Sequence, residues 1–120
     1  MRHRKRKKVL DRKAPARAAL LRSLLCKMVI HKKVKTTRAK ASVLRSRVER
    51  LVTKAGKSGL QTRRELLRQL GNGAEAQMAI DILIKDLGPK YTKRPGGYTR
   101  TVKVGLRQGD AAEMAIIEFV

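Results

Sequence analysis

The C-terminal stretch that decides the fold begins with an alternating run, Tyr98-Thr99-Arg100-Thr101-Val102-Lys103-Val104-Gly105-Leu106. Apolar Val102, Val104 and Leu106 fall on one side of this run, and polar residues fall on the other, namely Thr99, Thr101 and Lys103. Such alternation predicts a β-strand. Gly109-Asp110 then signals a turn, and residues 113–120, rich in Ile, Met and Phe, read as a second strand. We therefore expect residues 98–106 and 113–120 to form an antiparallel hairpin with a loop of five or six residues.

Upstream of this hairpin, apolar residues recur at the three- and four-residue spacing of amphipathic helices. The first such helix covers about residues 16–30, and Pro15 suits its opening turn because the missing N–H would be unpaired there. A short alternating segment, 32–37, follows and predicts a strand. Thr37 is then suited to cap a second helix, which Gly56 should end.

Two further helices carry their own start signals. Ser58 with Gln61 forms a capping box, and Gly71 closes the helix that follows. Asn72 with Glu75 offers a second cap, and the last helix should stop at Gly88-Pro89, where glycine can take a left-handed conformation.

The predicted order is therefore α-β-α-α-α-β-β. This order indicates an α+β protein, a two-layer α/β sandwich with a small three-stranded sheet and helices on one face. We expect residues 1–13 to form an extended basic arm and residues 14–120 a single domain. Where the first strand joins the hairpin stays open from the sequence.

Charge is distributed very unevenly along the chain. The first 48 residues carry 18 Lys or Arg and one acid, Asp11, whereas the remaining 72 carry 13 basic and 8 acidic residues. A net charge of +22 repels itself in a folded chain, and a polyanion partner cancels that repulsion. Nucleic acid is the polyanion that best explains it, because each neutralised phosphate releases counterions. For the arm alone, a disordered tail that aids solubility is the alternative.

The sequence offers little chemistry for catalysis or metal binding. Cys26 is the only cysteine, and the two histidines, His3 and His31, are far apart in sequence. No pair of acids resembles a catalytic dyad, and Gly71-Asn72-Gly73 lacks the spacing of a nucleotide-binding loop. We expect no enzyme activity, no cofactor, no metal and no small-molecule substrate. No membrane span or signal peptide is expected either, since no apolar run is long enough.

A second basic segment lies outside the first 48 residues, at Arg94-Pro95-Gly96-Gly97-Tyr98-Thr99-Arg100. Two glycines allow close backbone approach, so their N–H groups with Arg94 and Arg100 could meet a phosphate. A plain turn from loop to strand explains the same residues equally well. Whether Tyr91 or Tyr98 stacks on a base or packs inside the protein also stays open.

Several short motifs occur together in order and at matching spacing, from Met1-Arg2-His3-Arg4-Lys5 and Val34-Lys35-Thr36-Thr37 to Leu87-Gly88-Pro89-Lys90-Tyr91, Gly96-Gly97-Tyr98-Thr99-Arg100 and Gly109-Asp110-Ala111-Ala112. In these motifs the chain resembles the bacterial large-subunit ribosomal protein seventeen family over essentially its whole length. The resemblance implies a structural protein of the cytoplasmic ribosome. It also implies a seat on large-subunit ribosomal RNA near the rim of the peptide exit tunnel, beside neighbouring large-subunit ribosomal proteins.

Charge and resemblance together give one set of candidate RNA-binding residues. They are Arg2, His3, Arg4, Lys5, Arg6, Lys7, Lys8 and Arg12 of the arm, Lys33, Lys35, Arg38, Lys40, Arg45 and Arg47 beyond it, and Lys93, Arg94, Gly96, Gly97, Tyr98 and Arg100 of the second segment. A DNA-binding protein and a protein of the membrane surface are the rival classes. For the DNA-binding class, the consecutive helices could include a helix-turn-helix. Against the membrane-surface class, no bulky apolar face that could insert into a membrane lies beside the basic arm.

Overall fold

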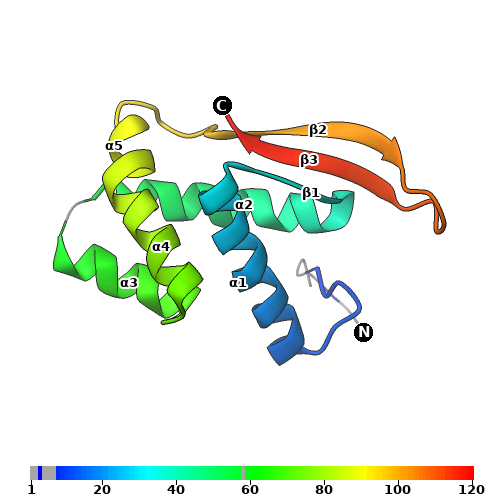
Figure 1. Ribbon diagram of the computed structural model, residues 1–120, viewed down its shortest axis with the longest axis horizontal. Coiled ribbons are helices and arrows are strands. Elements are labelled where there is room, and N and C mark those ends of the chain that lie inside the picture. The colour runs from blue at the N-terminus through cyan, green and yellow to red at the C-terminus, as the bar shows by residue number, and fades with distance from the viewer. Residues whose placement is uncertain (1–2, 4–7, 58) are drawn as a thin grey trace.

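The computed structural model describes residue 3 and residues 8–57 and 59–120. The chain runs through α1 (Ala14–His31), β1 (Lys33–Thr37), α2 (Arg38–Ala55), α3 (Leu60–Leu70), α4 (Ala74–Ile82), a π-helical turn η1 (Leu83–Leu87), α5 (Gly88–Lys90), β2 (Thr99–Leu106) and β3 (Glu113–Phe119). The predicted α+β class and the order of its main elements are confirmed. Figure 1 shows the helices on one side of the sheet and the β2–β3 hairpin reaching past them.

The sheet has the strand order β1-β3-β2, and both pairings are antiparallel. The predicted hairpin is confirmed, with six residues, 107–112, between its strands. The structure also settles where the first strand joins, because β1 pairs with β3 from Lys33 opposite Glu118 to Thr37 opposite Met114. The C-terminal strand is therefore the central one.

The core lies among α1, α2, α3, α4 and η1 and extends to the inner face of the sheet. Of these helices, α2 contacts all three strands. The apolar stripe predicted for α2 is buried throughout, at Ala41, Leu44, Val48, Leu51, Val52 and Ala55. From the sheet, Ala115 and Ile117 of β3 are fully buried. Their neighbours in register, Thr36 and Val34, belong to the same face because side chains of a strand alternate between its two sides. Ile116 and Met114 of β3 accordingly lie on the outer face.

A β-bulge corrects the predicted pattern of the hairpin. The register of β2 against β3 shifts between Lys103 and Gly105, so Val104 is an extra residue. Beyond the bulge Leu106 pairs with Glu113, on the side of Ala115, whereas Val102 pairs with Ile116. Val102 and Leu106 therefore do not share a face as expected, because one inserted residue reverses the alternation.

The predicted ends of the first three helices hold, but their caps differ. α1 begins at Ala14 with Pro15 in its first turn, α2 ends just before Gly56, and Gly71 follows α3 with φ of 92°. Thr37 occupies the N-cap position of α2, yet its side chain makes no capping hydrogen bond. As the last residue of β1, opposite Met114, Thr37 lies on the outer face of the sheet and away from the helix.

The predicted cap at Asn72 and Glu75 is wrong, because Gly73 is the N-cap of α4 and no side chain caps it. Asn72 contributes its backbone carbonyl instead, which accepts a hydrogen bond from Gln77 Nε2 at 3.2 Å. The predicted capping box of Ser58 with Gln61 is not the cap of α3 either, because Gly59 is its N-cap and no side chain caps it. Ser58 itself lies outside the described residues.

The predicted stop at Gly88-Pro89 is also wrong. The helix continues through the π-helical turn into α5 and ends at Lys90, and Gly88 has the right-handed φ of −56°. A Cβ on Gly88 would lie 2.6 Å from the carbonyl oxygen of Ala55 at the end of α2. Glycine therefore serves a close crossing of two helix ends there, and not a left-handed cap.

Candidate nucleic-acid interface

A basic groove lies between α1 and α2, and it encloses about 440 Å³. Its lining comes from the arm, from α1 and from α2, namely Lys8, Arg17, Leu21, Ser42, Val43, Ser46, Arg47 and Arg50. The contributions of α2 recur at four-residue intervals from Ser42 and Val43, which places them along one face of the helix. Among the described residues, the lining has four cations, two hydroxyls and no carboxylate.

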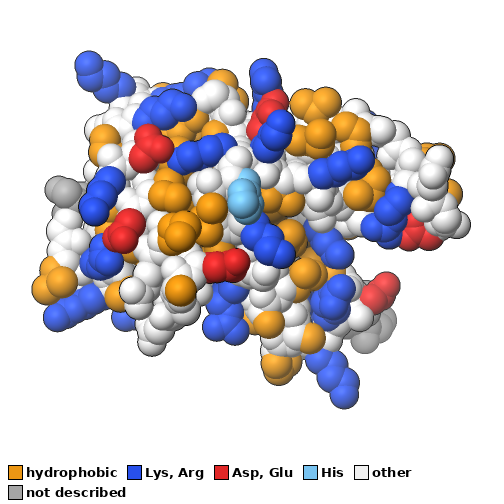
Figure 2. Space-filling view, in the orientation of Figure 1, with side chains coloured by type: hydrophobic (Ala, Val, Ile, Leu, Met, Phe, Trp, Pro, Cys, Tyr) orange, Lys and Arg blue, Asp and Glu red, His pale blue; other side chains and the backbone are white. Residues whose placement is uncertain are grey.

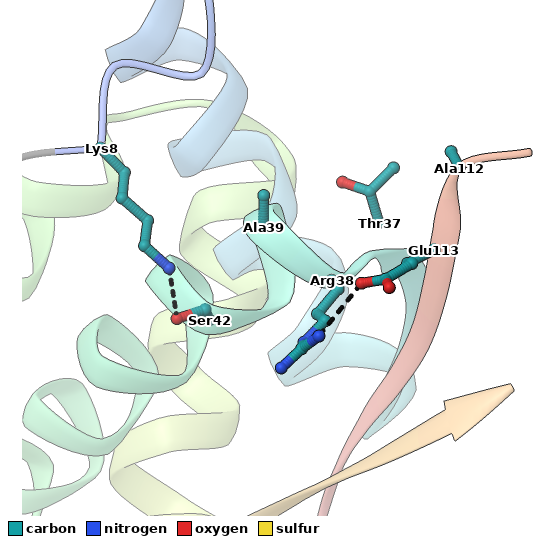
Figure 3. A pocket seen from close by; sticks show the side chains of 7 residues that line it. All are labelled: Lys8, Thr37, Arg38, Ala39, Ser42, Ala112 and Glu113. Carbon is teal, nitrogen blue, oxygen red and sulfur yellow. Dashed lines mark hydrogen bonds and ion pairs between the residues drawn. The ribbon is translucent and has the colours of Figure 1, made fainter. Parts of the chain in front are cut away.

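Lys8 ties the arm to this groove. Its ammonium donates a hydrogen bond to Ser42 Oγ over 2.8 Å, as Figure 3 shows. Ser42 also lines two neighbouring hollows, of about 530 and 430 Å³, which reach the start of β3 and the side of β2. The arm therefore meets α2 where three hollows adjoin.

The acids of the chain neutralise particular cations and leave others unpaired. Within the described residues there are seven ion pairs: Lys32–Asp86, Arg38–Glu113, Arg45–Glu49, Lys54–Glu65, Arg63–Asp81, Arg100–Glu118 and Arg107–Asp110. The four cations of the groove form no ion pair with any described acid. Because an exposed ion pair is worth little, the paired arginines remain able to exchange a carboxylate for a phosphate.

The structure divides the candidate residues of the first segment among separate surfaces. Lys8 and Arg47 line the groove, whereas Arg38 and Arg45 face the hollow between α2 and β2. Lys33 and Lys35 lie on the outer face of β1, and Lys40 lines none of these hollows. Of the other candidate arm residues, His3 and Arg12 are exposed, whereas the rest lie outside the described residues, namely Arg2, Arg4, Lys5, Arg6 and Lys7. The candidate cations of this segment therefore lie on more than one surface of the protein.

The second candidate segment borders a hollow of about 310 Å³ between the end of α2, α5 and the loop before β2. Tyr98 is buried there, with its ring 5.1 Å from that of Tyr91. Its hydroxyl donates to the carbonyl oxygen of Arg94 at 3.2 Å. Both tyrosines therefore pack inside the protein, and Tyr98 acts on the loop by holding Arg94 in place.

Gly96 and Gly97 need their glycine identity for the backbone, with φ of 135° and 63°. A Cβ at either position would meet nothing within 4 Å, so steric room is not the reason. Neither amide donates a hydrogen bond to any described residue. The loop therefore combines a tight turn with two unbonded backbone N–H groups, beside the cations Lys93 and Arg94. The turn and a phosphate contact are thus compatible explanations of the two glycines.

The sequence analysis did not include three cations among the candidates. They are Arg17 and Arg50 of the groove and Lys57 of the 310 Å³ hollow beside the second candidate segment. Arg50 carried a usable signal, because it follows Arg47 by three residues and so lies on the same side of α2. Arg17 carried none, since its place depends on how α1 crosses α2.

Nothing in the described part of the chain resembles a catalytic or metal centre. No group of three or more His, Cys, Asp or Glu side chains there could hold a metal ion. Burial, and then the carboxylate of Glu75, raise the pKa of the Cys26 thiol, which opposes a nucleophilic role. No described helix is long and apolar enough to cross a membrane. Fold and surface together define a small, strongly basic α+β protein.

Comparison with known proteins identifies the family. The model of the family described as ribosomal protein L17 matches residues 20–120. Over its full length the chain is 43% identical to the large ribosomal subunit protein bL17 of Nautilia profundicola and covers 98% of it. It is 45% identical to the protein of that name from Gemmatimonas aurantiaca, again over 98% of that chain, and 46% identical to the one from Neorickettsia sennetsu over both whole chains.

The chain therefore belongs to the ribosomal protein L17 family of bacteria. As a member it is a ribosomal protein of the large subunit, a structural component acting in translation and not an enzyme. Its place is the ribosome, which is cytoplasmic in bacteria.

Proposed function

We propose that this protein binds large-subunit ribosomal RNA through the groove between α1 and α2 and stabilises the packing of that RNA. One observation carries the proposal: Lys8, Arg17, Arg47 and Arg50 converge with two serine hydroxyls, and no carboxylate lines the groove. Guanidinium and ammonium groups beside hydroxyls suit the phosphate oxygens of a nucleic-acid backbone. By family resemblance, its seat is near the rim of the peptide exit tunnel and beside other large-subunit proteins.

Two other candidate cations of α2 extend this surface. Arg38 and Arg45 continue it along α2 toward the hairpin, and Lys8 adds the positive charge of the arm at Ser42. Lys93 and Arg94, with the free amides of Gly96 and Gly97, form a second contact. Positive charge on several elements can then bridge RNA segments that are distant in sequence.

Salt dependence of RNA binding tests this mechanism. If about eight phosphates are engaged, log affinity should fall with log salt at a slope of about −6 to −7. Binding of the whole chain to a large-subunit ribosomal RNA fragment is measured by filter binding between 50 and 300 mM salt (roughly the range over which counterion release dominates), with duplex DNA of equal length as competitor. An affinity that hardly changes with salt, or stronger binding to the DNA, contradicts the proposal.

A further inference from the structure

The outer face of the sheet carries an apolar strip that none of the described helices covers. Its central row joins Val102 of β2 to Ile116 of β3, and the next row places Met114 beside Gly105. Val102 is 44% exposed, and Val104, the extra residue of the bulge, is 42% exposed. Figure 2 shows hydrophobic side chains over these strands with Lys and Arg beside them.

A basic column borders this strip. Lys33 and Lys35 of β1 lie on the same outer face, since in the strand register they are opposite Glu118 and Ile116 of β3. Both lysines are exposed, and neither forms an ion pair with any described acid. Glu118 is already bonded to Arg100 across the sheet at 2.6 Å, so it closes one end of the strip as a neutral pair. The face thus presents apolar side chains along one side and two unbalanced positive charges along the other.

RNA and a second copy of the chain both fit this face poorly. Most contacts with a nucleic acid go to phosphate and sugar oxygens, and Val102, Ile116 and Met114 offer no donor to them. A second copy would bring another net charge of +22 against the same lysines. A protein segment with apolar residues and adjacent carboxylates complements both halves of the face.

We propose that the outer face of the sheet docks an amphipathic protein segment, with its apolar side chains over Val102, Ile116 and Met114 and its Asp or Glu side chains at Lys33 and Lys35. This inference rests on the proposed neighbourhood of other large-subunit proteins and names the surface and the chemistry of one such neighbour. Burial of exposed apolar area supplies affinity, and the lysines set the orientation of the segment.

Site-specific photocrosslinking in purified large subunits tests the proposal. Benzoylphenylalanine replaces Val102 in one variant and Leu60, 65% exposed on α3, in a control. We expect Val102 to give an adduct with another protein, mapped to a segment with acids beside apolar residues. An adduct with RNA or with a second copy, or a yield no higher than that from Leu60, overturns the proposal.

Charge reversal separates docking from general basicity. Lys33→Glu with Lys35→Glu should lower the adduct yield about fivefold, the size expected for losing two exposed charge contacts. The matched pair Arg64→Glu with Arg68→Glu, on the exposed side of α3, should leave the yield unchanged. Equal losses in both pairs contradict the assigned role of the lysines.

A small replacement covers the case in which the bulky side chain blocks assembly. Val102→Cys should react with maleimide in the free protein and be protected in the subunit, with buried Cys26 as the unreactive internal reference. Equal reactivity in both states overturns the inference. If the Val102 variant forms the protein adduct but RNA affinity hardly changes with salt, only the proposed RNA-binding mechanism is refuted.

Discussion

Glu49 of α2 and Thr99, the first residue of β2, are joined by a hydrogen bond in which Thr99 Oγ1 donates to Glu49 Oε1 at 3.0 Å. The Glu49 side chain is 25% exposed, and it also lies 3.8 Å from Arg45 Nε one helical turn away. Thr99 is buried, so the bond is largely shielded from water. This contact anchors the start of the hairpin to the helix that carries most of the basic groove.

Removing that contact should destabilise the fold. We expect Glu49→Ala to lower the free energy of unfolding by about 1–2 kcal/mol, because Thr99 is left without its charged partner. Glu65→Ala is the control, since Glu65 forms a looser, exposed pair with Lys54 at 3.9 Å and should cost less than about 0.5 kcal/mol. Urea denaturation measures both, and equal losses would contradict the special role of Glu49.

Gly88 should tolerate no side chain. In Gly88→Ala the new Cβ would meet the backbone of Ala55, so α2 and α5 must move apart at a cost of about 1–3 kcal/mol. Gly73→Ala is the control, because Gly73 has φ of −64° and open space around it. The free energy of unfolding of the Gly73→Ala variant should stay within about 0.5 kcal/mol of that of the parent protein. A thermal melt that ranks the two variants the other way would refute the close-crossing argument.

The groove cations should matter for RNA binding more than equal charge elsewhere. We expect Arg47→Gln with Arg50→Gln to weaken binding to a ribosomal RNA fragment about tenfold or more and to reduce the salt slope by about two. Arg64→Gln with Arg68→Gln removes the same charge from exposed, unpaired positions of α3. If this second pair weakens binding as much as the first, net charge alone carries the affinity and the groove has no special part.

The stability of the loop between β2 and β3 should depend on pH. Hydrogen bonds from Arg107 and from the amide of Ala112 lower the pKa of the Asp110 carboxyl from 3.8 to about 2. The folded value lies below the unfolded one, so the contribution of Asp110 to stability is present above about pH 4 and is lost as pH falls toward 2. NMR titration of the Asp110 carboxyl and of the Ala112 amide should report a midpoint near 2. In Asp110→Asn the Ala112 amide should show no such step, and a midpoint near 4 in the parent would refute the assignment.

The hairpin is the part of the sheet that the sequence predicts best. Alternation around Val102 and Ile116 predicted both strands and their pairing, because a half-exposed strand must alternate. The bulge at Val104 had only one sign in the sequence, the isolated Gly105, which has a φ of 96°, because the apolar alternation continues through it. The same limit applies at Gly88, whose identity reads as a helix stop until Ala55 is seen against it.

The candidate site divides in the same way. Arg47 was recognised from the charge of its segment, whereas Arg17 was not, because its neighbours belong to another helix. Tyr98 was a candidate site residue because it belongs to the Gly96–Arg100 motif. Only the structure shows that it packs against Tyr91 and supports the loop from inside the protein.

The sequence by itself determined the uneven charge, the amphipathic stripes, the hairpin and the family, since each depends on residue types and their spacing along the chain. Only the tertiary structure decided that β1 lies beside β3 and which cations meet in one groove. It also decided which apolar side chains of the sheet stay uncovered. These features depend on how helices cross and on which strand face α2 covers, and those choices come from packing between segments that lie far apart in the chain.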